Sequence, residues 1–311
     1  MPEAPTKWTL ALEPGPAAAL ATVTVAVTSL WADAVRDSTM SPQTHDKLVL
    51  FLRRFEHFAA AHAVATIGEI DHALVHRFVT AQGRSRHGTV TEAAAATQAG
   101  RRSAIRALYR TARHIGLIVD DPTTNISLPT RSQSDQRPVT SDEAAMIRLF
   151  CQRERPTRHA ATIALLLSGA HTAELGAITT NDIDLGANNF RAHGSSKHRA
   201  RLLPLDAWST RVLTDRVEFL LRQQSRGDQP PVVCTSSGGS EAHKQSRVCV
   251  TVRDVLTRAG LSDDPTIIPT SLTTYAARQE FERTGRIESA AAVLGATSLD
   301  TTATLIGYRW R

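Results

Sequence analysis

Apolar residues recur at helical spacing along most of this chain, and short turn-rich stretches separate the helical runs. The clearest stripe lies three or four positions apart and therefore occupies one face of a helix; its members are Ala104, Ile105, Leu108, Ala112 and Ile115. Another helix is expected to open at Lys244–Arg247, to run to Arg258 and to end at Gly260. The pattern predicts a mainly α-helical protein.

Other stretches predict a small sheet and a division into two domains. Residues 183–205 favour a short antiparallel sheet around the turn Gly194–Ser195. The polar stretch 128–138 has prolines near both ends and no apolar period, which is typical of a linker. Thr140 and Glu143 have the spacing of a capping box, so a helix should begin the second domain there. We therefore expect an N-terminal extension (1–40), a helical domain (41–128), a linker (129–139) and a second domain (140–311).

The uncharged segment from Ala17 to Trp31 is shorter than the roughly 20 residues that cross a bilayer. Acidic residues at Glu3 and Glu13 also argue against the basic start of a signal peptide. We expect this segment to form an added helix or strand before the helical domain, with no membrane partner. Its packing partner cannot be inferred from the sequence.

Composition agrees with two ordinary cores and an anionic partner. The chain has 311 residues, 41% of them hydrophobic, and a formal net charge of +6. Cys151, Cys234 and Cys249 lack the spacing of a metal site or a disulfide framework, and the 12 histidines are scattered. We expect a reduced, cytoplasmic protein with no metal, no cofactor and no small-molecule substrate.

Basic residues gather in one part of the helical domain. Between His76 and Leu117 the only acid is Glu92, whereas a solvated face normally mixes both signs. The basic residues there are Arg77, Arg84, Arg86, Arg101, Arg102, Arg106, Arg110 and Arg113. This bias favours a nucleic-acid surface. We predict that Arg84, Arg86, Arg101, Arg102 and Arg106 contact DNA there.

Three stretches of the second domain together resemble the catalytic half of the tyrosine recombinases, the phage integrase and Xer-like family. They are Ser168–Leu175 (SGAHTAEL), Thr270–Thr273 (TSLT) and Leu294–Leu305. The usual family wording is TGLRxSEL, HxLRH and LGHxxxxTTxxY. The helix Leu48–Ala61, the phrase Thr66–Ile70 and the run Arg101–Gly116 similarly resemble the helical core-binding, SAM-like domain of that family. The resemblance implies a two-domain clamp around DNA, mainly α with a small antiparallel sheet.

The resemblance also implies an active site whose working residues are missing. In the family a tyrosine attacks the phosphate, two arginines hold its oxygens, and lysine and histidine side chains move protons. Ala296 lies 23 positions after Thr273, and Leu305 lies 9 positions further, which is the Xer-like spacing. The catalytic positions therefore fall on His171, Ser195 (or Ser196), Thr270, Thr273, Ala296 and Leu305. None of these residues supplies the family's chemistry, so no catalytic residue is assigned.

Two residues near this frame leave alternatives open. Lys197 follows the lysine position by one or two places, and Tyr308 follows the nucleophile position by three. Three residues along a helix displace a hydroxyl by roughly 4 to 5 Å, which makes Tyr308 a poor replacement. The resemblance further suggests DNA contacts in the hairpin and at the helix opened by Lys244; these are Lys197, Arg199, Arg201, Lys244 and Arg247.

Three hypotheses follow from the sequence. The first is a non-catalytic, double-stranded DNA-binding protein of bacterial type with an architectural, regulatory or partition role on the nucleoid. The second is a recombinase that still cuts, through Tyr308 or with residues of a second copy or an active recombinase. The third is a protein-interaction module that no longer binds DNA. The one-signed arginine cluster favours the first, because it has little reason to persist without an anion.

Overall fold

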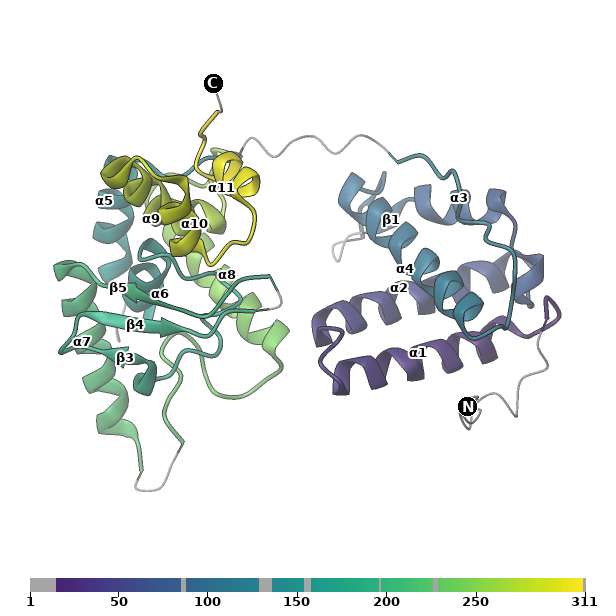
Figure 1. Ribbon diagram of the computed structural model, residues 1–311, viewed down its shortest axis with the longest axis horizontal. Helices are drawn as coiled ribbons and strands as arrows, with labels where there is room; N and C mark the ends of the chain where they lie inside the picture. The colour runs from purple at the N-terminus through teal and green to yellow at the C-terminus, as the bar shows by residue number, and fades with distance from the viewer. Residues whose placement is uncertain are drawn as a thin grey trace. The chain divides into compact units, whose positions relative to one another are not determined.

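The computed structural model describes residues 15–84, 88–128, 136–153, 158–195, 197–225 and 229–309, which fall into two compact units, Met1–Gln133 and Ser134–Arg311. Both units are built mainly from helices, and the second also contains a small antiparallel sheet (Figure 1). The expected fold class is thereby confirmed. No helix in the described ranges is long and apolar enough to cross a membrane.

The described residues of the first unit form a bundle of four helices around one apolar core. Its elements are α1 (Leu20–Arg36), α2 (Pro42–Ala61), the 3-10 turn η1 (Ile67–Glu69), α3 (His72–Thr80), the strand pair β1 (Gly83–Arg84) and β2 (Val90–Thr91), and α4 (Ala95–His114). α1 contributes Val23, Val27 and Trp31 to this core, and it packs on α2 and α4. The segment expected as an added helix or strand is therefore a helix that packs on this bundle.

The helix α4 passes through the first unit with one face buried and one exposed. Ala104, Ile105, Leu108 and Ala112 are fully buried, as the apolar stripe predicted. The helix begins at Ala95 and ends at His114, so it starts earlier than the run that the resemblance marked. Because the apolar residues recur every three or four positions and share one face, the exposed face carries the polar and basic side chains.

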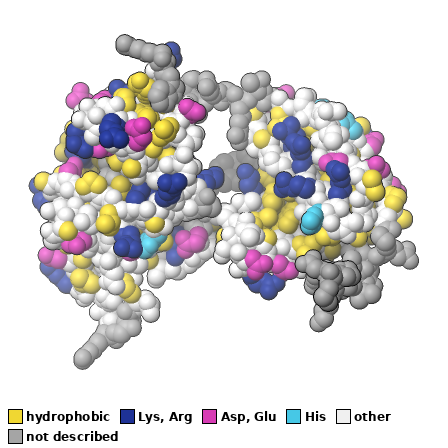
Figure 2. Space-filling view, in the orientation of Figure 1, with side chains coloured by type: hydrophobic (Ala, Val, Ile, Leu, Met, Phe, Trp, Pro, Cys, Tyr) yellow, Lys and Arg dark blue, Asp and Glu magenta, His cyan; other side chains and the backbone are white. Residues whose placement is uncertain are grey.

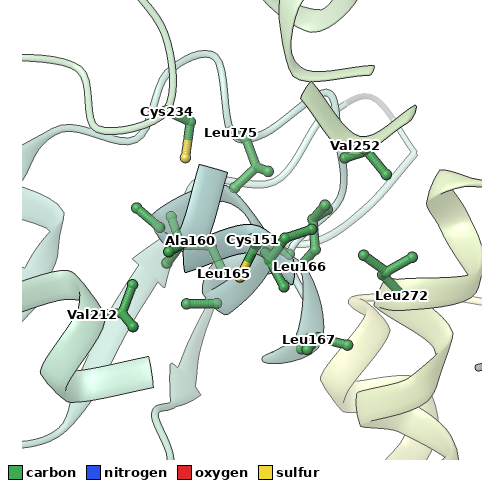
Figure 3. Packing of buried hydrophobic residues seen from close by; sticks show 14 of the residues in the cluster. Cys151, Ala160, Leu165, Leu166, Leu167, Leu175, Val212, Cys234, Val252 and Leu272 are labelled. Carbon is green, nitrogen blue, oxygen red and sulfur yellow. The ribbon is translucent and has the colours of Figure 1, made fainter. Parts of the chain in front are cut away.

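The second unit is built around the buried helix α6 (Arg158–Leu167). Its elements are α5 (Ser141–Phe150), η2 (Cys151–Arg153), α6 (Arg158–Leu167), η3 (Thr180–Asp182), β3 (Ile183–Asp184), β4 (Asn189–Ala192), β5 (Arg201–Pro204), α7 (Ala207–Gln223), α8 (Glu241–Arg258), α9 (Pro269–Thr284), α10 (Ile287–Leu294) and α11 (Leu299–Leu305). Leu165 and Leu166 of α6 are completely buried. Figure 3 shows them among Val212 of α7, Val252 of α8 and Leu272 of α9.

Two local predictions for the second unit are confirmed and one boundary is wrong. The capping box at Thr140 and Glu143 starts α5, and the strands β3, β4 and β5 form one antiparallel sheet with Phe190 opposite Leu203. α8 begins at Glu241, three residues before the predicted start, because Ser240 caps it by accepting from the His243 N–H. Its predicted last residue, Arg258, is correct.

The last three helices form a separate small apolar cluster. Its members are Ala277, Phe281, Ile287, Ala290, Val293, Leu294, Ala296, Ala303, Leu305, Ile306 and Tyr308. The Tyr308 ring lies 4.9 Å from the Phe281 ring, measured between centroids, and the Arg278 guanidinium donates to the Ile306 carbonyl at 3.0 Å. These contacts hold α11 against α9 of the same chain.

Candidate functional site

The six positions of the catalytic frame belong to five separate parts of the second unit. His171 lies in the turn after α6, and Ser195 lies in the β4–β5 hairpin. Thr270 and Thr273 lie in α9, Ala296 follows α10, and Leu305 ends α11. Ser196, the other place for the lysine, lies outside the described residues. Hydrogen bonds connect several of these elements at the frame.

His171 occupies the first arginine position as a buried internal residue. Its side chain is 9% exposed, and its Nε2 donates to the Leu294 carbonyl at the end of α10 over 2.8 Å. The His198 ring from the hairpin stacks on it at 3.6 Å between centroids. Burial lowers the pKa of His171 despite the bond to Leu294. A neutral imidazole in this place is a poor substitute for a guanidinium that must hold a phosphate.

His198 covers the other face of this stack. Burial, followed by the charge of His171, lowers its pKa to about 4. Its Nδ1 lies 3.2 Å from the Ser195 hydroxyl. Ser195, which stands at the position of the family's lysine, therefore makes a contact within the hairpin turn. At neutral pH both imidazoles are therefore uncharged, and a stack of two uncharged rings is free of the repulsion that two imidazolium ions would have.

Arg201 is the only arginine that enters this region among the described residues, and its donors are used inside the protein. Its NH1 and NH2 form a two-pronged bond with the Glu174 carboxylate at 2.8 and 3.0 Å. The side chains of the pair are 8% and 0% exposed. NH2 also donates to the Gly169 carbonyl, and Nε donates to the Val293 carbonyl at 2.6 Å.

Glu174 is held ionised by this arrangement. Burial alone raises the pKa of the carboxyl group, but the hydrogen bonds and charge of Arg201 and the N–H of His171 outweigh it and lower the net pKa. The charge of Arg201 is thus balanced within the protein. The DNA contact predicted for Arg201 stays a prediction, and this bonding disfavours it, because a phosphate would have to displace the buried carboxylate and leave it unpaired.

The hairpin is also attached to the end of α10 through its backbone. The Arg199 N–H donates to the Gly295 carbonyl at 2.9 Å. Gly295 has φ +64°, and a Cβ at that position would lie 2.7 Å from the Arg199 carbonyl oxygen. The backbones therefore meet at a distance that only glycine permits. This attachment keeps the β4–β5 hairpin on the emptied site.

Of the remaining frame positions, Thr273 is buried, whereas Thr270, Ala296 and Leu305 are partly buried. Thr273 is 1% exposed, and its hydroxyl donates to the Ala170 carbonyl at 2.8 Å. Leu305 and Ala296 pack in the apolar cluster of the last three helices. Tyr308 packs there too, against Phe281.

Arg101 was predicted to contact DNA, and its place in the structure disfavours this prediction. The residue is 7% exposed, and its NH1 donates to the carbonyls of Phe78, Val79 and Ala81 where α3 ends. It therefore supplies donors to helix-end carbonyls that lack a partner within the helix. Burial, with a smaller effect of Arg54, lowers its pKa. The signal was present in the sequence, since position 101 continues the apolar stripe of α4.

The other predicted contacts of the first unit differ among themselves. Arg106 is exposed, whereas Arg102 is partly buried and donates to the Ile126 carbonyl at 2.7 Å. Arg84 stands in β1, and Arg86 lies outside the described residues. Arg110 and Arg113 are exposed on the same helix as Arg106 but were left out of the predicted contact set.

The three exposed arginines of α4 surround an open concavity of about 510 Å³. Its wall consists of Ser103, Arg106, Ala107, Arg110, Arg113 and Asp121. Figure 2 shows Lys and Arg side chains on the viewed face of the first unit, next to an area of hydrophobic side chains. The basic cluster found in the sequence already contained these three arginines, but only Arg106 was among the predicted contacts.

The predicted contacts in the second unit are divided in a similar way. Lys197 and Arg199 are exposed on the hairpin. Lys244 has a side chain only 15% exposed and pairs with Glu241 at 3.0 Å. Arg247 is exposed and donates to the Ser236 hydroxyl and the Gly238 carbonyl, so its contacts order the loop before α8. Within the described ranges, no three His, Cys, Asp or Glu side chains are grouped to hold a metal.

Comparison with known proteins gives the class of this fold. Residues 27–116 match the model of the phage integrase N-terminal SAM-like domain. The structure is similar to a lambda integrase dimer bound to a COC' core site, with a TM-score of 0.63 and 15% identity over 92% of this chain and 97% of that one. It is also similar to the XerH recombinase bound to difH, with a TM-score of 0.58 and 16% identity over 86% of this chain and 76% of that one. The fold is that of the tyrosine recombinases and integrases.

A sequence relative agrees with this class. Tyrosine recombinase XerC of Roseiflexus castenholzii (strain DSM 13941 / HLO8) is 26% identical over 223 residues, which are 67% of this chain and 67% of that protein. The chain is therefore similar in sequence to an Xer-type tyrosine recombinase, and its residues 27–116 match the phage integrase SAM-like domain. The resemblance found in the sequence is confirmed.

Proposed function

We propose that this protein binds double-stranded DNA with a tyrosine-recombinase fold and does not cleave it. One observation carries the proposal: the frame positions lack the family's catalytic side chains, and the nearby guanidinium of Arg201 is bonded to Glu174 inside the protein. Covalent cleavage needs a nucleophile, and the developing charge on the phosphate needs preorganised donors. A shared fold does not transfer the chemistry of its relatives to this chain.

DNA binding is supported by charge and by similarity. The exposed Arg106, Arg110 and Arg113 on α4, with Lys197 and Arg199 on the hairpin, offer two separate groups of cations. Relatives of this fold have been solved as complexes with DNA, including lambda integrase and XerH. Cations of this kind give affinity for phosphates, which is the main source of non-specific DNA binding. An architectural, regulatory or partition role on the nucleoid, in the cytoplasm of a bacterium, fits such a protein.

Cleavage through Tyr308 is the alternative, and the packing of that side chain disfavours it. Its ring contacts Phe281 in an apolar cluster, and its backbone N–H donates to the Ala303 carbonyl at 2.8 Å. Moving the hydroxyl to a phosphate would disrupt the attachment of the segment after α11. A mixed assembly, in which an active recombinase supplies the nucleophile, would need no such movement.

The test combines binding and cleavage on one set of DNA duplexes. The full chain is mixed with labelled duplexes for a gel-shift assay, and with nicked suicide duplexes for detection of a covalent adduct. An active Xer recombinase serves as the positive control for adduct formation. We expect a salt-dependent shift and no adduct. An adduct that is lost in Tyr308→Phe would overturn the non-catalytic proposal, and absence of any shift at low salt would overturn DNA binding.

A further inference from the structure

Two histidines of α3 form a pair that lies outside the site described above. His72 and His76 are the only two of the chain's 12 histidines that lie four residues apart. Residues at this spacing are neighbours on one face of a helix. Both residues are exposed, and their rings lie 6.4 Å apart between centroids and within 18° of parallel. The helix therefore presents two imidazoles side by side to solvent.

The backbone under this pair is held in place by the rest of the first unit. Leu74, Val75 and Phe78 of α3 are buried in the core of that unit. The Arg101 guanidinium binds carbonyls near the end of α3, and the Asp71 carboxylate accepts from the Leu74 N–H at its start over 2.7 Å. Because the helix is fixed at both ends, only the two side chains have to turn when a ligand binds.

The ring nitrogens of the pair are available to a ligand. Within the described ranges, neither ring has a hydrogen bond or an ion pair. Other histidines of the chain are already engaged. His159 and His193, for example, lie 3.0 and 2.8 Å from the carboxylates of Asp254 and Asp182. The α3 pair is thus suited to a partner from outside the chain.

Two imidazoles in this arrangement suit a divalent transition-metal ion. Zn²⁺ binds an imidazole nitrogen at about 2.0 to 2.1 Å, so two nitrogens that share one ion lie roughly 3 Å apart. The rings of His72 and His76 have to approach each other by roughly 1 Å to reach this position. Exposed side chains make such rotations readily. Imidazole ligands favour Zn²⁺, Ni²⁺ and Cu²⁺, whereas Mg²⁺ and Ca²⁺ prefer oxygen ligands.

Two features limit the affinity of such a site. No third His, Cys, Asp or Glu is grouped with the pair in the part of the chain that the structure describes, so water has to complete the coordination. His72 is also the first residue of α3, where the helix dipole disfavours a cation. The Asp71 carboxylate before it offsets part of this effect. The ion is therefore exchangeable, in contrast to the ion of a closed structural zinc site.

We propose that His72 and His76 bind one divalent transition-metal ion, of the type Zn²⁺, Ni²⁺ or Cu²⁺, across the first turn of α3. This inference departs from the sequence prediction of no metal, which treated the histidines as scattered. It does not rest on the proposed DNA-binding function. An ion that binds only the folded helix stabilises that helix by mass action, so metal binding should suppress the local opening of α3.

Calorimetric titration of the full chain measures the site. The chain carries no polyhistidine tag, since a tag binds the same ions, and the pH is about 7.5 because ligating imidazoles must be deprotonated. We expect one ion per chain, with Cu²⁺ bound more tightly than Zn²⁺ or Ni²⁺, and no competition from excess Mg²⁺.

Three variants identify the ligands. Loss of a residue that only orients a metal ligand costs about 10- to 100-fold in affinity, so His72→Gln and His76→Gln should each cost at least as much. The matched control is His57→Gln on α2, an exposed histidine with no other histidine three or four residues away. Its affinity for each ion should equal that of the unchanged protein. Circular dichroism verifies that all three variants are folded.

Hydrogen exchange locates the bound ion independently. At a Zn²⁺ concentration of about 100 times Kd, local opening of α3 should be suppressed about 100-fold, and peptides of α7 in the second unit should be unchanged. The inference is refuted if the unchanged protein binds these ions no more tightly than His76→Gln does. Binding that persists in both single variants, or protection of α3 that is equal in His72→Gln, would also refute it. None of these measurements contains DNA, so failure of the proposed function leaves them unaffected.

Discussion

Arg201 offers the sharpest test of the internal bonding that we describe at the emptied site. We consider the substitution Arg201→Met, which keeps the length of the side chain and removes its donors. The pair with Glu174 has side chains 8% and 0% exposed. Removing one partner of a buried ion pair leaves the other charge without compensation and costs about 3 to 5 kcal/mol. The carbonyls of Gly169 and Val293 also lose a donor.

The assay must report on the two units separately. Hydrogen exchange followed by mass spectrometry, at increasing urea concentrations, gives the free energy of opening for peptides of α6 and, independently, for peptides of α4. We expect Arg201→Met to lower the opening free energy of the α6 peptides by about 3 to 5 kcal/mol and to leave the α4 peptides unchanged.

A matched control removes a pair of the same type from the surface. Arg222 and Glu218 lie on α7 at 2.8 Å with side chains 79% and 56% exposed. Arg222→Met should therefore cost less than about 1 kcal/mol. The double variant Arg201→Met, Glu174→Leu removes both charges and should recover much of the loss. The reasoning is refuted if Arg201→Met costs no more than Arg222→Met, or if the double variant is no better than the single one.

Three further predictions test other parts of the second unit. Because the pKa values of His171 and His198 are lowered in the folded state, the unfolded chain binds protons at a higher pH than the folded unit does. The stability of this unit should therefore fall as pH drops from 6.5 toward about 4. Urea unfolding at several pH values measures this stability, and a flat profile would contradict the prediction. Gly295→Ala should destabilise more than Gly285→Ala in the same unfolding assay. Both glycines have positive φ, but a Cβ would lie 2.7 Å from a carbonyl oxygen only at Gly295, so equal losses would contradict the close approach. Leu305→Tyr alone should form no adduct with a nicked suicide duplex, because the phosphate-binding arginines remain absent; an adduct would show that the site needs only its nucleophile.

Much of the architecture could be predicted because it depends on local signals. The apolar stripe of α4 identified its buried face, and the capping box at Thr140 located the start of α5. The emptied frame could be found because spacing survives when side chains change. The bounds of α1 and its packing against α2 and α4 could not be predicted, since they depend on contacts between distant segments.

The use of individual arginines was harder to predict, although signals existed. Arg101 continues the apolar stripe of α4, and Arg201 shares the inward-facing side of β5 with Leu203, because alternate residues of a strand point the same way. A count of basic side chains predicts an anionic binding partner, even where some of these side chains are bonded inside the protein. Their carbonyl and carboxylate partners become visible only when residues from separate elements are placed together, as with Glu174.

The attachment of the hairpin to Gly295 has a consequence for how this protein can change over time. His171, Thr273 and Arg201 each serve a neighbouring backbone or carboxylate. A mutation that restores one catalytic side chain at a frame position, such as an arginine at His171 or Thr273, would therefore remove a hydrogen bond of the folded unit. If strand cleavage is absent, as we propose, its recovery would need several coordinated changes, because these residues now depend on one another.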